Sequence, residues 1–224
     1  MLLVVFGMQY FFLIILCSLS LNSCSDDTVS PSDSNPTVTI GNQTWMSKNL
    51  DVATFQNGDI IPEAKTEEEL NSAIANNQPA WCYYNFDPAN GTIYGRLYNW
   101  HAVNDQRKIA PIGFHVASDA EWTQLTTYLG TDSAGAKMKS TVGWSENGSG
   151  TNLSGFNALP GGGYGYEPWG QGYFSGIGGF GFWWSSTGDN EYTAWGRDMY
   201  NRRSSVGRFS DSKSFYFSVR CIKD

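Results

Sequence analysis

Charged residues are scarce in this chain of 224 residues. Aspartate, glutamate, lysine and arginine together make up 16% of the sequence, against about 25% in an average soluble domain. The net charge is −7, which argues against a nucleic-acid partner or an anionic membrane surface. Aromatic residues, by contrast, reach 15%, and each ring buries a large area. The chain can therefore form a sizeable core without many charges.

The motifs of common enzyme classes are absent as well. The sequence contains no G-x-S-x-G, no H-E-x-x-H and no glycine loop placed before a helix to hold a phosphate. The two histidines, His101 and His115, are expected in the packed interior with one hydrogen bond each. A zinc site would need both of them to converge with two cysteines, and none of these residues shows ligand spacing. We therefore predict a protein that is not an enzyme, with no catalytic residue.

One long apolar stretch is present, in residues 1–23. Its strongest uninterrupted part, residues 10–17, is too short to cross a bilayer, which takes about 20 residues. The stretch predicts a signal peptide, with Met1 or Met8 as its start. It ends in "LNSC", which resembles a bacterial lipobox, so Cys24 is predicted to carry a lipid anchor. An ordinary cysteine after a simple cleavable signal peptide is the alternative.

Residues 24–36 follow as a polar segment that contains serine and proline and shows no apolar periodicity. This composition predicts a flexible tether behind the lipidated cysteine. Its acidic pair, Asp26-Asp27, resembles the signal that directs some Gram-negative lipoproteins to the outer face of the outer membrane. We therefore predict a lipid-anchored protein of the outer membrane, exposed at the cell surface. Residues 37–224 contain no second linker and are expected to form one domain.

Local patterns within that domain predict both strands and helices. Residues 37–40 and 43–46 alternate around Gly41-Asn42, which is typical of a β-hairpin. Capping boxes predict two helices, one after Thr66 and one after Ser118, where Gly130 ends the second. The last residues, "SFYFSVRCIKD", alternate as a strand does. The fold class is therefore α+β, with the terminal strands paired and two short helices.

Seven segments in order resemble one family of bacterial surface lipoproteins. They are "TVTIGNQTWMSKNL", "WCYYNFDP", "YGRLYNWHAV", "APIGFHVASDAEWTQL", "SGFNALPGG", "FWWSST" and "FSVRCIKD". Together they resemble the Fibrobacter succinogenes major paralogous domain, over the whole of residues 37–224. That family is similar in turn to the formylglycine-generating-enzyme type of C-type-lectin fold. The resemblance implies a C-type-lectin-like architecture with a long, irregular, glycine- and aromatic-rich loop half that presents the ligand surface.

Residues 161–184 would form most of that loop half. Ten of these 24 residues are glycine and nine are aromatic, so the stretch is too aromatic for a disordered spacer. If a strand enters at "FGFWWSST", then Trp183 and Trp184 point to opposite faces and one of them is expected to be exposed. Exposed rings beside amide and charged groups are typical of sugar-binding surfaces. The candidate ligand-binding residues are Tyr164, Tyr166, Trp169, Tyr173, Trp184, Arg197, Tyr200, Asn201 and Arg202.

Two further features concern cross-links and metals. An exported domain meets an oxidising compartment, so Cys82 and Cys221 are candidates for a disulfide, and two buried free thiols are the alternative. The bond would close a loop of more than 100 residues, which is worth about 4–5 kcal/mol. No cofactor is predicted, although Asp189, Asn190 and Glu191 offer three oxygen ligands in a turn, so calcium is possible there.

The function predicted from the sequence is a cell-surface binding module that recognises a glycan or polysaccharide through the aromatic, glycine-rich face. Three alternatives remain: a protein-binding adhesin that uses the same face, a structural surface protein, and a diverged enzyme of the formylglycine-generating type. Such an enzyme would use a pair of thiols in the loop half, where this chain has none. Fold alone does not decide among these functions.

Overall fold

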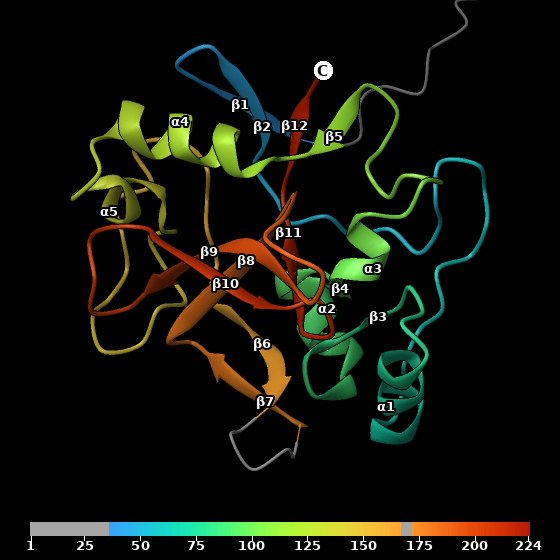
Figure 1. The fold of residues 1–224 in the computed structure, drawn as a ribbon. Coiled ribbons are helices and arrows are strands. Elements are labelled where there is room, and N and C mark those ends of the chain that lie inside the picture. Colours follow the sequence, from blue (N-terminus) through green and yellow to red (C-terminus); the bar gives the residue numbers. More distant parts are fainter. Residues whose placement is uncertain (1–35, 167–171) are drawn as a thin grey trace, which may run out of the picture. The chain divides into compact units, whose positions relative to one another are not determined.

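The computed structural model describes residues 36–166 and 172–224 (Figure 1). The helices and strands of this described part lie in the compact unit Asp33–Asp224. They form two β-sheets and several short helices, so the predicted α+β class is confirmed. Within the described ranges, no helix is long and apolar enough to cross a membrane. The predicted signal peptide, Cys24 and the tether up to residue 35 lie outside the described residues.

The smaller sheet brings the two ends of the domain together, in the strand order β1-β2-β12-β5. Its strands are β1 (Thr37–Ile40), β2 (Gln43–Met46), β5 (Phe114–Val116) and β12 (Cys221–Lys223). The predicted hairpin is present, and Gly41 in its turn has a φ of 63°, a conformation that favours glycine. Ile222 lies antiparallel opposite Trp45. The predicted pairing of the terminal strands is therefore confirmed.

The larger sheet has the strand order β10-β9-β8-β6-β11-β4-β3, and β7 is attached to β6. Its strands are β3 (Trp81–Cys82), β4 (Leu97–Asn99), β6 (Gly161–Tyr166), β7 (Gly172–Ile177), β8 (Phe180–Gly188), β9 (Thr193–Tyr200), β10 (Gly207–Ser212) and β11 (Tyr216–Val219). The strands β8, β9 and β10 run antiparallel in sequence, while β8 and β11 pair in parallel.

The glycine-rich tract is not the irregular loop that the sequence predicts. Its described residues form β6, β7 and the start of β8. The glycines are needed because aromatic rings pack directly on these strands. A Cβ atom at Gly163 would lie 2.7 Å from the ring of Phe217, and one at Gly181 would lie 2.3 Å from the ring of Trp183. Glycines that make room for rings hide the alternation by which a strand is recognised.

Both predicted helices are present, and the predicted capping box is complete at Ser118 but only half formed at Thr66. The Ser118 hydroxyl accepts a hydrogen bond from the Glu121 N–H, and the Glu121 carboxylate accepts one from the Ser118 N–H. At the other helix the Thr66 hydroxyl accepts from the Glu69 N–H at 3.2 Å, but the Glu69 carboxylate accepts from the N–H of Lys65. These helices are α1 (Glu67–Ala75) and α4 (Asp119–Leu129).

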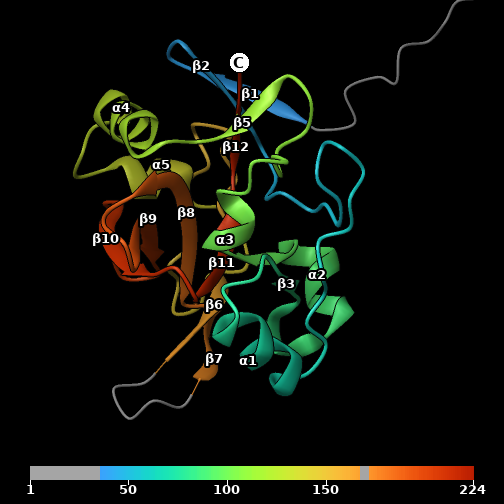
Figure 2. The same ribbon diagram turned by 45° about the vertical axis from the view of Figure 1, so that its right-hand side comes forward.

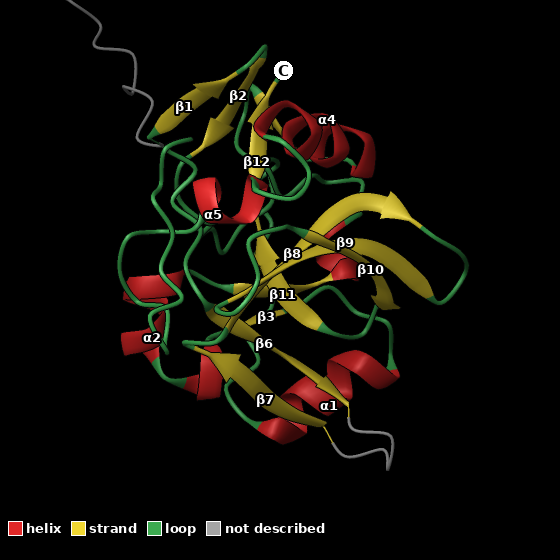
Figure 3. Ribbon diagram, turned by 90° about the vertical axis from the view of Figure 1, so that its left-hand side faces the viewer, coloured by secondary structure: helices red, strands yellow, loops and turns green. Residues whose placement is uncertain are grey.

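The sequence predicts two helices, and the structure adds shorter ones. They are α2 (Pro88–Tyr94), α3 (Trp100–Val103), α5 (Ala134–Met138) and the 3-10 turn η1 (Tyr84–Phe86). Side chains of Asp87 and Asn99 cap the first two, but helices of four to seven residues are too short for a clear apolar stripe. Helix α1 and α2 lie around β3 (Figure 2), and α4 packs above β8 and β9 (Figure 3).

Three clusters of buried side chains make up the core, and tryptophan lies at the centre of two of them. Trp45 and Trp122 meet at 5.0 Å between ring centroids beneath α4. Trp183 belongs to this cluster, whereas Trp184 packs on the other face of β8 against Phe217 at 4.6 Å. Both are fully buried, so the expectation that one of them is exposed is wrong. The sheet is covered on both faces at that point.

Candidate functional site

The register of β8, β9 and β10 gathers aromatic side chains on one face of the larger sheet. Phe180 lies opposite Tyr200, and Phe182 lies opposite Asp198. Because alternate residues of a strand share a face, the side chains on this side are Phe180, Phe182, Trp184, Asp198, Tyr200, Phe209 and Asp211. We call this set the aromatic face. The opposite face carries Trp183 and Arg197 and is covered by α4.

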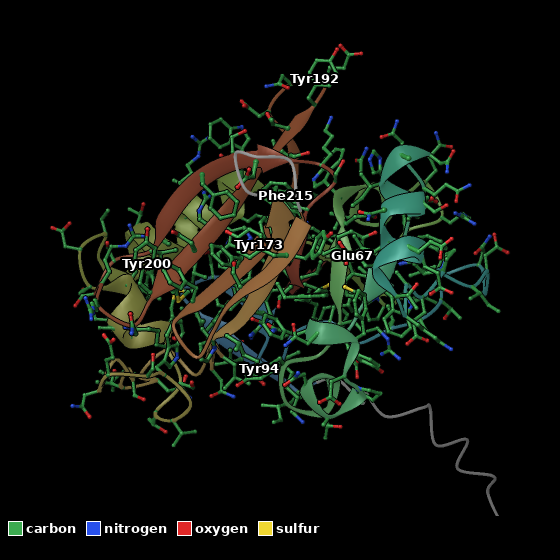
Figure 4. All side chains as sticks on the ribbon, turned by 90° about the horizontal axis from the view of Figure 1, so that it is seen from below. Glu67, Tyr94, Tyr173, Tyr192, Tyr200 and Phe215 are labelled. Atoms are coloured by element: carbon green, nitrogen blue, oxygen red, sulfur yellow. The ribbon has the colours of Figure 1, made fainter. Side chains whose placement is uncertain are left out.

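A cavity of about 310 Å³ opens on the aromatic face beside β6 and β7. We call it the Asp211 pocket. Figure 4 shows Tyr173 and Phe215 near each other on this side of the molecule. The residues that line it come from five strands and the turn before β11: Gly163, Tyr164, Gly165, Tyr173, Ser175, Phe182, Asp211, Phe215 and Phe217.

The rings that line the Asp211 pocket stand at definite angles to one another. The ring of Phe215 is nearly perpendicular to that of Phe217, at 85° and 6.1 Å between centroids. Phe182 stacks on Phe217 at 5.1 Å. A Cβ atom at Gly165 would lie 3.1 Å from the ring of Phe215. The glycines of β6 thus let the rings approach and leave the cavity open between them.

Among the described residues, no opposite charge lies near the carboxylate of Asp211. Its side chain accepts a hydrogen bond from the Ser212 N–H at 3.2 Å, and within residues 36–166 and 172–224 it forms no ion pair. Burial raises the pKa of Asp211 above its usual value, because water is partly excluded from the charged form. The pocket therefore combines several ring faces with one partly desolvated negative charge.

A second hollow, of about 530 Å³, lies at the end of β9, and we call it the Tyr200 hollow. Its lining residues are Ser145, Glu146, Gly176, Ile177, Gly179, Phe180, Tyr200, Asn201 and Arg202. The Asn201 amide donates a hydrogen bond to the hydroxyl of Ser145 at 3.1 Å. Arg202 forms an exposed ion pair with Glu146, which lowers the pKa of that carboxylate through the hydrogen bond between them. The rim of the hollow is thus polar and carries both signs of charge.

Tyr200 itself is fixed from two sides. Its ring meets that of Phe180 at 4.6 Å between centroids, and the guanidinium of Arg203 lies 4.2 Å from the ring centroid. Such cation–π contacts are worth about 0.5–2 kcal/mol. Arg203 also pairs with Asp198 at 2.7 Å. The ring of Tyr200 is therefore held rigidly at the wall of the hollow.

The two hollows follow each other along β7 and β8. Phe180 lines the Tyr200 hollow and Phe182 lines the Asp211 pocket, and these two rings are stacked with an interplanar angle of 9°. On β7, Ile177 lines the former and Tyr173 the latter. A ligand long enough to occupy both hollows would lie along this pair of strands.

Several predicted ligand-binding residues line these hollows. Tyr173, Tyr200, Asn201 and Arg202 do so, and Tyr173 is 40% exposed. Tyr164 lines the Asp211 pocket but is almost fully buried, so its predicted position on an exposed loop is wrong. Trp169 and the side chain of Tyr166 lie outside the described residues.

Two predicted ligand-binding residues are structural instead. Trp184 is fully buried, and its indole N–H donates to the carbonyl oxygen of Tyr98 at 3.0 Å. Arg197 is buried beneath α4, where it pairs with Asp119 at 2.6 Å and donates to the hydroxyl of Thr123. It points to the face opposite the hollows because of strand alternation. The prediction that these two residues bind a ligand is therefore wrong.

The predicted disulfide is absent. Cys82 and Cys221 are both free and fully buried. They lie on β3 and β12, which belong to different sheets, and they pack into different core clusters. Burial raises the pKa of both thiols, that of Cys221 to about 12. The alternative of two buried free thiols is the correct one.

In the turn proposed for calcium, the side-chain oxygens of Asp189 and Asn190 accept hydrogen bonds from the protein itself. The Asp189 carboxylate accepts hydrogen bonds from Ser210 at 2.7 Å and from Thr193 at 3.1 Å. The Lys213 ammonium donates to the carbonyl oxygens of Asn190 and Glu191. In the described part of the chain, no three histidine, cysteine, aspartate or glutamate side chains are grouped to hold a metal.

The histidines differ from the expectation of buried rings with one hydrogen bond each. His115 is 43% exposed at its side chain and bridges Glu121 at 2.8 Å and Asp224 at 2.7 Å. His101 has a buried Nε2 with no hydrogen-bond partner in the described structure, and burial lowers its pKa. The two rings lie in different surroundings and form no common site.

Sequence reasoning missed Asp211, Phe182 and Phe215 as lining residues. The segment "SDSKS" around Asp211 looks like a polar turn. A usable signal was the alternation of Phe209 and Asp211, two residues apart on one strand. It could have placed this carboxylate on an aromatic face.

Comparison with known proteins gives a family and no closer relative. The model of the Fibrobacter succinogenes major domain matches residues 38–223, which include every strand and helix described above except the first residue of β1. No curated protein and no solved structure matches the chain. The matched segment covers far more than half of the 224 residues, and the chain therefore belongs to the Fibrobacter succinogenes major domain family.

Proposed function

We propose that the domain is a binding module that holds a glycan or polysaccharide along the aromatic face. The observation that carries this proposal is the succession of two ring-lined hollows along β7 and β8. Sugar rings present apolar faces that stack on aromatic side chains, and hydroxyl groups at their edges that need polar partners. The Asp211 pocket and the Tyr200 hollow offer both kinds of contact side by side.

The polar partners are well placed for that role. Asn201 and Arg202 lie at the rim of the Tyr200 hollow, and Ser175 and Asp211 line the other hollow. Amide, guanidinium and carboxylate groups are the ones that hydrogen-bond sugar hydroxyls in pairs. A lined volume of about 310–530 Å³ per hollow is within the range of small-ligand sites.

The experiment is a screen of residues 33–224 on a glycan array and in polysaccharide-containing gels, with calcium and with chelator. This fragment contains all three core clusters of the described structure. Tyr173→Ala and Asn201→Ala should each weaken saturable binding at least tenfold. Tyr192→Ala is the matched control, because Tyr192 is 74% exposed and lies away from Tyr173 and Tyr200 (Figure 4). Absence of binding to every glycan would count against the proposal.

A protein-binding adhesin is the second candidate, and the exposed edge of β7 favours it. Tyr173 and Ile177 are 40% and 38% exposed on this strand, which pairs with β6 alone among the described strands. Edge strands with apolar side chains are typical sites for a protein partner. A protein partner that binds residues 33–224 and is lost in Ile177→Lys, together with no binding to any glycan, would favour the adhesin.

The proposal includes a lipid anchor at the cell surface, on the strength of the N-terminal sequence. The apolar stretch that ends in "LNSC" supports processing at Cys24, and the anchor would present residues 37–224 outside the outer membrane. Metabolic labelling with a fatty acid should mark the wild-type chain and leave Cys24→Ala unlabelled. Equal labelling of both would rule out lipidation at Cys24.

A further inference from the structure

Among the described residues, Asp211 has no cationic partner, unlike two other part-buried aspartates, Asp198 on the same sheet and Asp119 on α4. Asp198 pairs with Arg203, and Asp119 pairs with Arg197 and Arg208. From the described part of the chain, the Asp211 carboxylate accepts one hydrogen bond, which the N–H of its neighbour Ser212 donates. A partly desolvated carboxylate without a counter-charge is unfavourable unless a partner arrives. This carboxylate is therefore suited to meet a positive charge that the described residues do not supply.

The nearest lysine along the chain does not fill that role. The Lys213 ammonium donates to the carbonyl oxygens of Asn190 and Glu191, and it lies 4.6 Å from the centroid of the Trp100 ring. These contacts hold it at the turn between β8 and β9. Asp211 is also the one charged residue among the described residues that line its pocket.

The walls of the Asp211 pocket are suited to a cation as well. Phe182, Phe215, Phe217 and Tyr173 line it with the carboxylate. The faces of such rings carry negative potential and attract ammonium groups, most strongly where water is partly excluded. The perpendicular setting of Phe215 and Phe217 provides two walls that meet at an angle. Binding sites for methylated ammonium groups are built from aromatic walls of this kind.

We propose that the Asp211 pocket binds an organic ammonium group, with the rings around the cation and the Asp211 carboxylate as its counter-charge. This deepens the proposed function and rests on it in one respect: a glycan held along β7 and β8 would present a free amino group here. The ammonium group can belong to an amino sugar of a polysaccharide or to a quaternary headgroup such as choline. Either source places one positive charge between the rings and the carboxylate.

Two pairs of probes test the charge requirement on the wild-type fragment 33–224 by titration calorimetry. Choline is compared with 3,3-dimethylbutan-1-ol, which has the same shape without the charge. Oligomers of glucosamine are compared with oligomers of N-acetylglucosamine, in which the amino groups are neutral. We expect the charged member of at least one pair to bind saturably and at least tenfold more tightly than its neutral counterpart. The pair that responds identifies the source of the ammonium group.

The variant Asp211→Asn removes the carboxylate with little change in shape and should weaken binding of the charged probe at least tenfold. Asp132→Asn removes the same charge from the surface and is the matched control. It should leave binding unchanged, which separates a local contact from attraction by the net charge of −7. If Asp211→Asn does not fold, Tyr173→Ala serves in its place, since Tyr173 is 40% exposed at the pocket.

Equal affinity for the charged and neutral members of both pairs would overturn the inference, and so would the absence of saturable binding by either ammonium probe. Equal weakening by Asp211→Asn and Asp132→Asn would overturn it too. These failures are distinct from failure of the proposed function. Neutral polysaccharides that bind without preference for ammonium would leave the glycan proposal standing, whereas choline binding without binding of any glycan would remove it.

Discussion

The ammonium group of Lys139 donates a hydrogen bond of 2.9 Å to the carbonyl oxygen of Tyr200. It donates further to the carbonyls of Asn201 and Arg203 and lies 5.1 Å from the centroid of the Trp144 ring. Lys139 is only 4% exposed, and burial lowers its pKa. One buried cation thus fixes the turn that carries the polar rim of the Tyr200 hollow.

Replacement of this lysine should lower the stability of the domain. Lys139→Met keeps most of the side-chain volume but removes the ammonium donor from three carbonyl oxygens, of which that of Tyr200 keeps the N–H of Arg203 at 3.3 Å. We therefore expect a loss of about 2–3 kcal/mol in the free energy of unfolding. Urea titration measures it. Lys48→Met, at an exposed position, should stay within about 0.5 kcal/mol of wild type. A similar small loss in Lys139→Met would show that the turn is held by other contacts.

Arg220 is a second buried cation that organises the fold. Its guanidinium donates to the carbonyls of Met46 and Phe156 and to the side chain of Asn49, at 2.6–2.9 Å, and it is almost fully buried. Arg220→Lys keeps the charge but replaces the planar guanidinium, whose two terminal nitrogens reach the three acceptors, with a single nitrogen that cannot occupy both positions. We expect it to lower the free energy of unfolding by about 3 kcal/mol. Arg202→Lys, at an exposed side chain, should change it by less than about 0.5 kcal/mol.

Short sequence patterns were sufficient to predict the elements that are stabilised by neighbouring residues. The capping box at Ser118 and Glu121 is complete within four residues, and the hairpin around Gly41 needs only its own turn. Such patterns involve neighbouring residues, so they can be recognised in a single sequence. The family resemblance, carried by seven short segments, was likewise readable and is confirmed over residues 38–223.

Features that depend on contacts between distant parts of the chain could not be predicted from such local patterns. Arg197 and Tyr200 are three residues apart on β9, yet one pairs with Asp119 beneath α4 and the other lines a hollow. Their opposite roles follow from the alternation of side chains along β9, a strand that the sequence patterns do not identify. Cys82 and Cys221 were candidates for a disulfide because nothing local indicates that β3 and β12 lie in separate sheets.

The two cysteines should behave as buried thiols. In the folded fragment 33–224 neither should react with a thiol reagent at pH 8, because burial raises the pKa of both and excludes the reagent. After unfolding in guanidinium without reductant, two thiols per chain should be titrated, since the fragment contains only Cys82 and Cys221. A count of zero would mean that they are bonded in solution. Cys221→Ser should cost about 1–3 kcal/mol through an added buried hydroxyl.

The last prediction concerns His115, which links strand β5 to the first turn of α4 and to Asp224. Burial alone would lower the pKa of His115, but the hydrogen bonds to Asp224 and Glu121 outweigh it and raise the pKa above the usual value. The protonated ring is therefore favoured in the folded protein. Its contribution to stability is fully present below the unfolded pKa, which is about 6.5, and is lost as the pH rises through the folded pKa.

His115→Gln should consequently destabilise the protein more at pH 5.5 than at pH 9, by at most about 1 kcal/mol because the pair is partly exposed to water. Urea titrations of wild type and variant at the two pH values measure the difference. His101→Gln provides the opposite case, since burial lowers the pKa of His101 and the neutral ring is favoured. Its effect should not grow toward low pH. If the effect of His115→Gln were equal at both pH values, the bridge would act through the neutral imidazole ring. The charge of the protonated ring would then contribute nothing to the contact between β5 and α4.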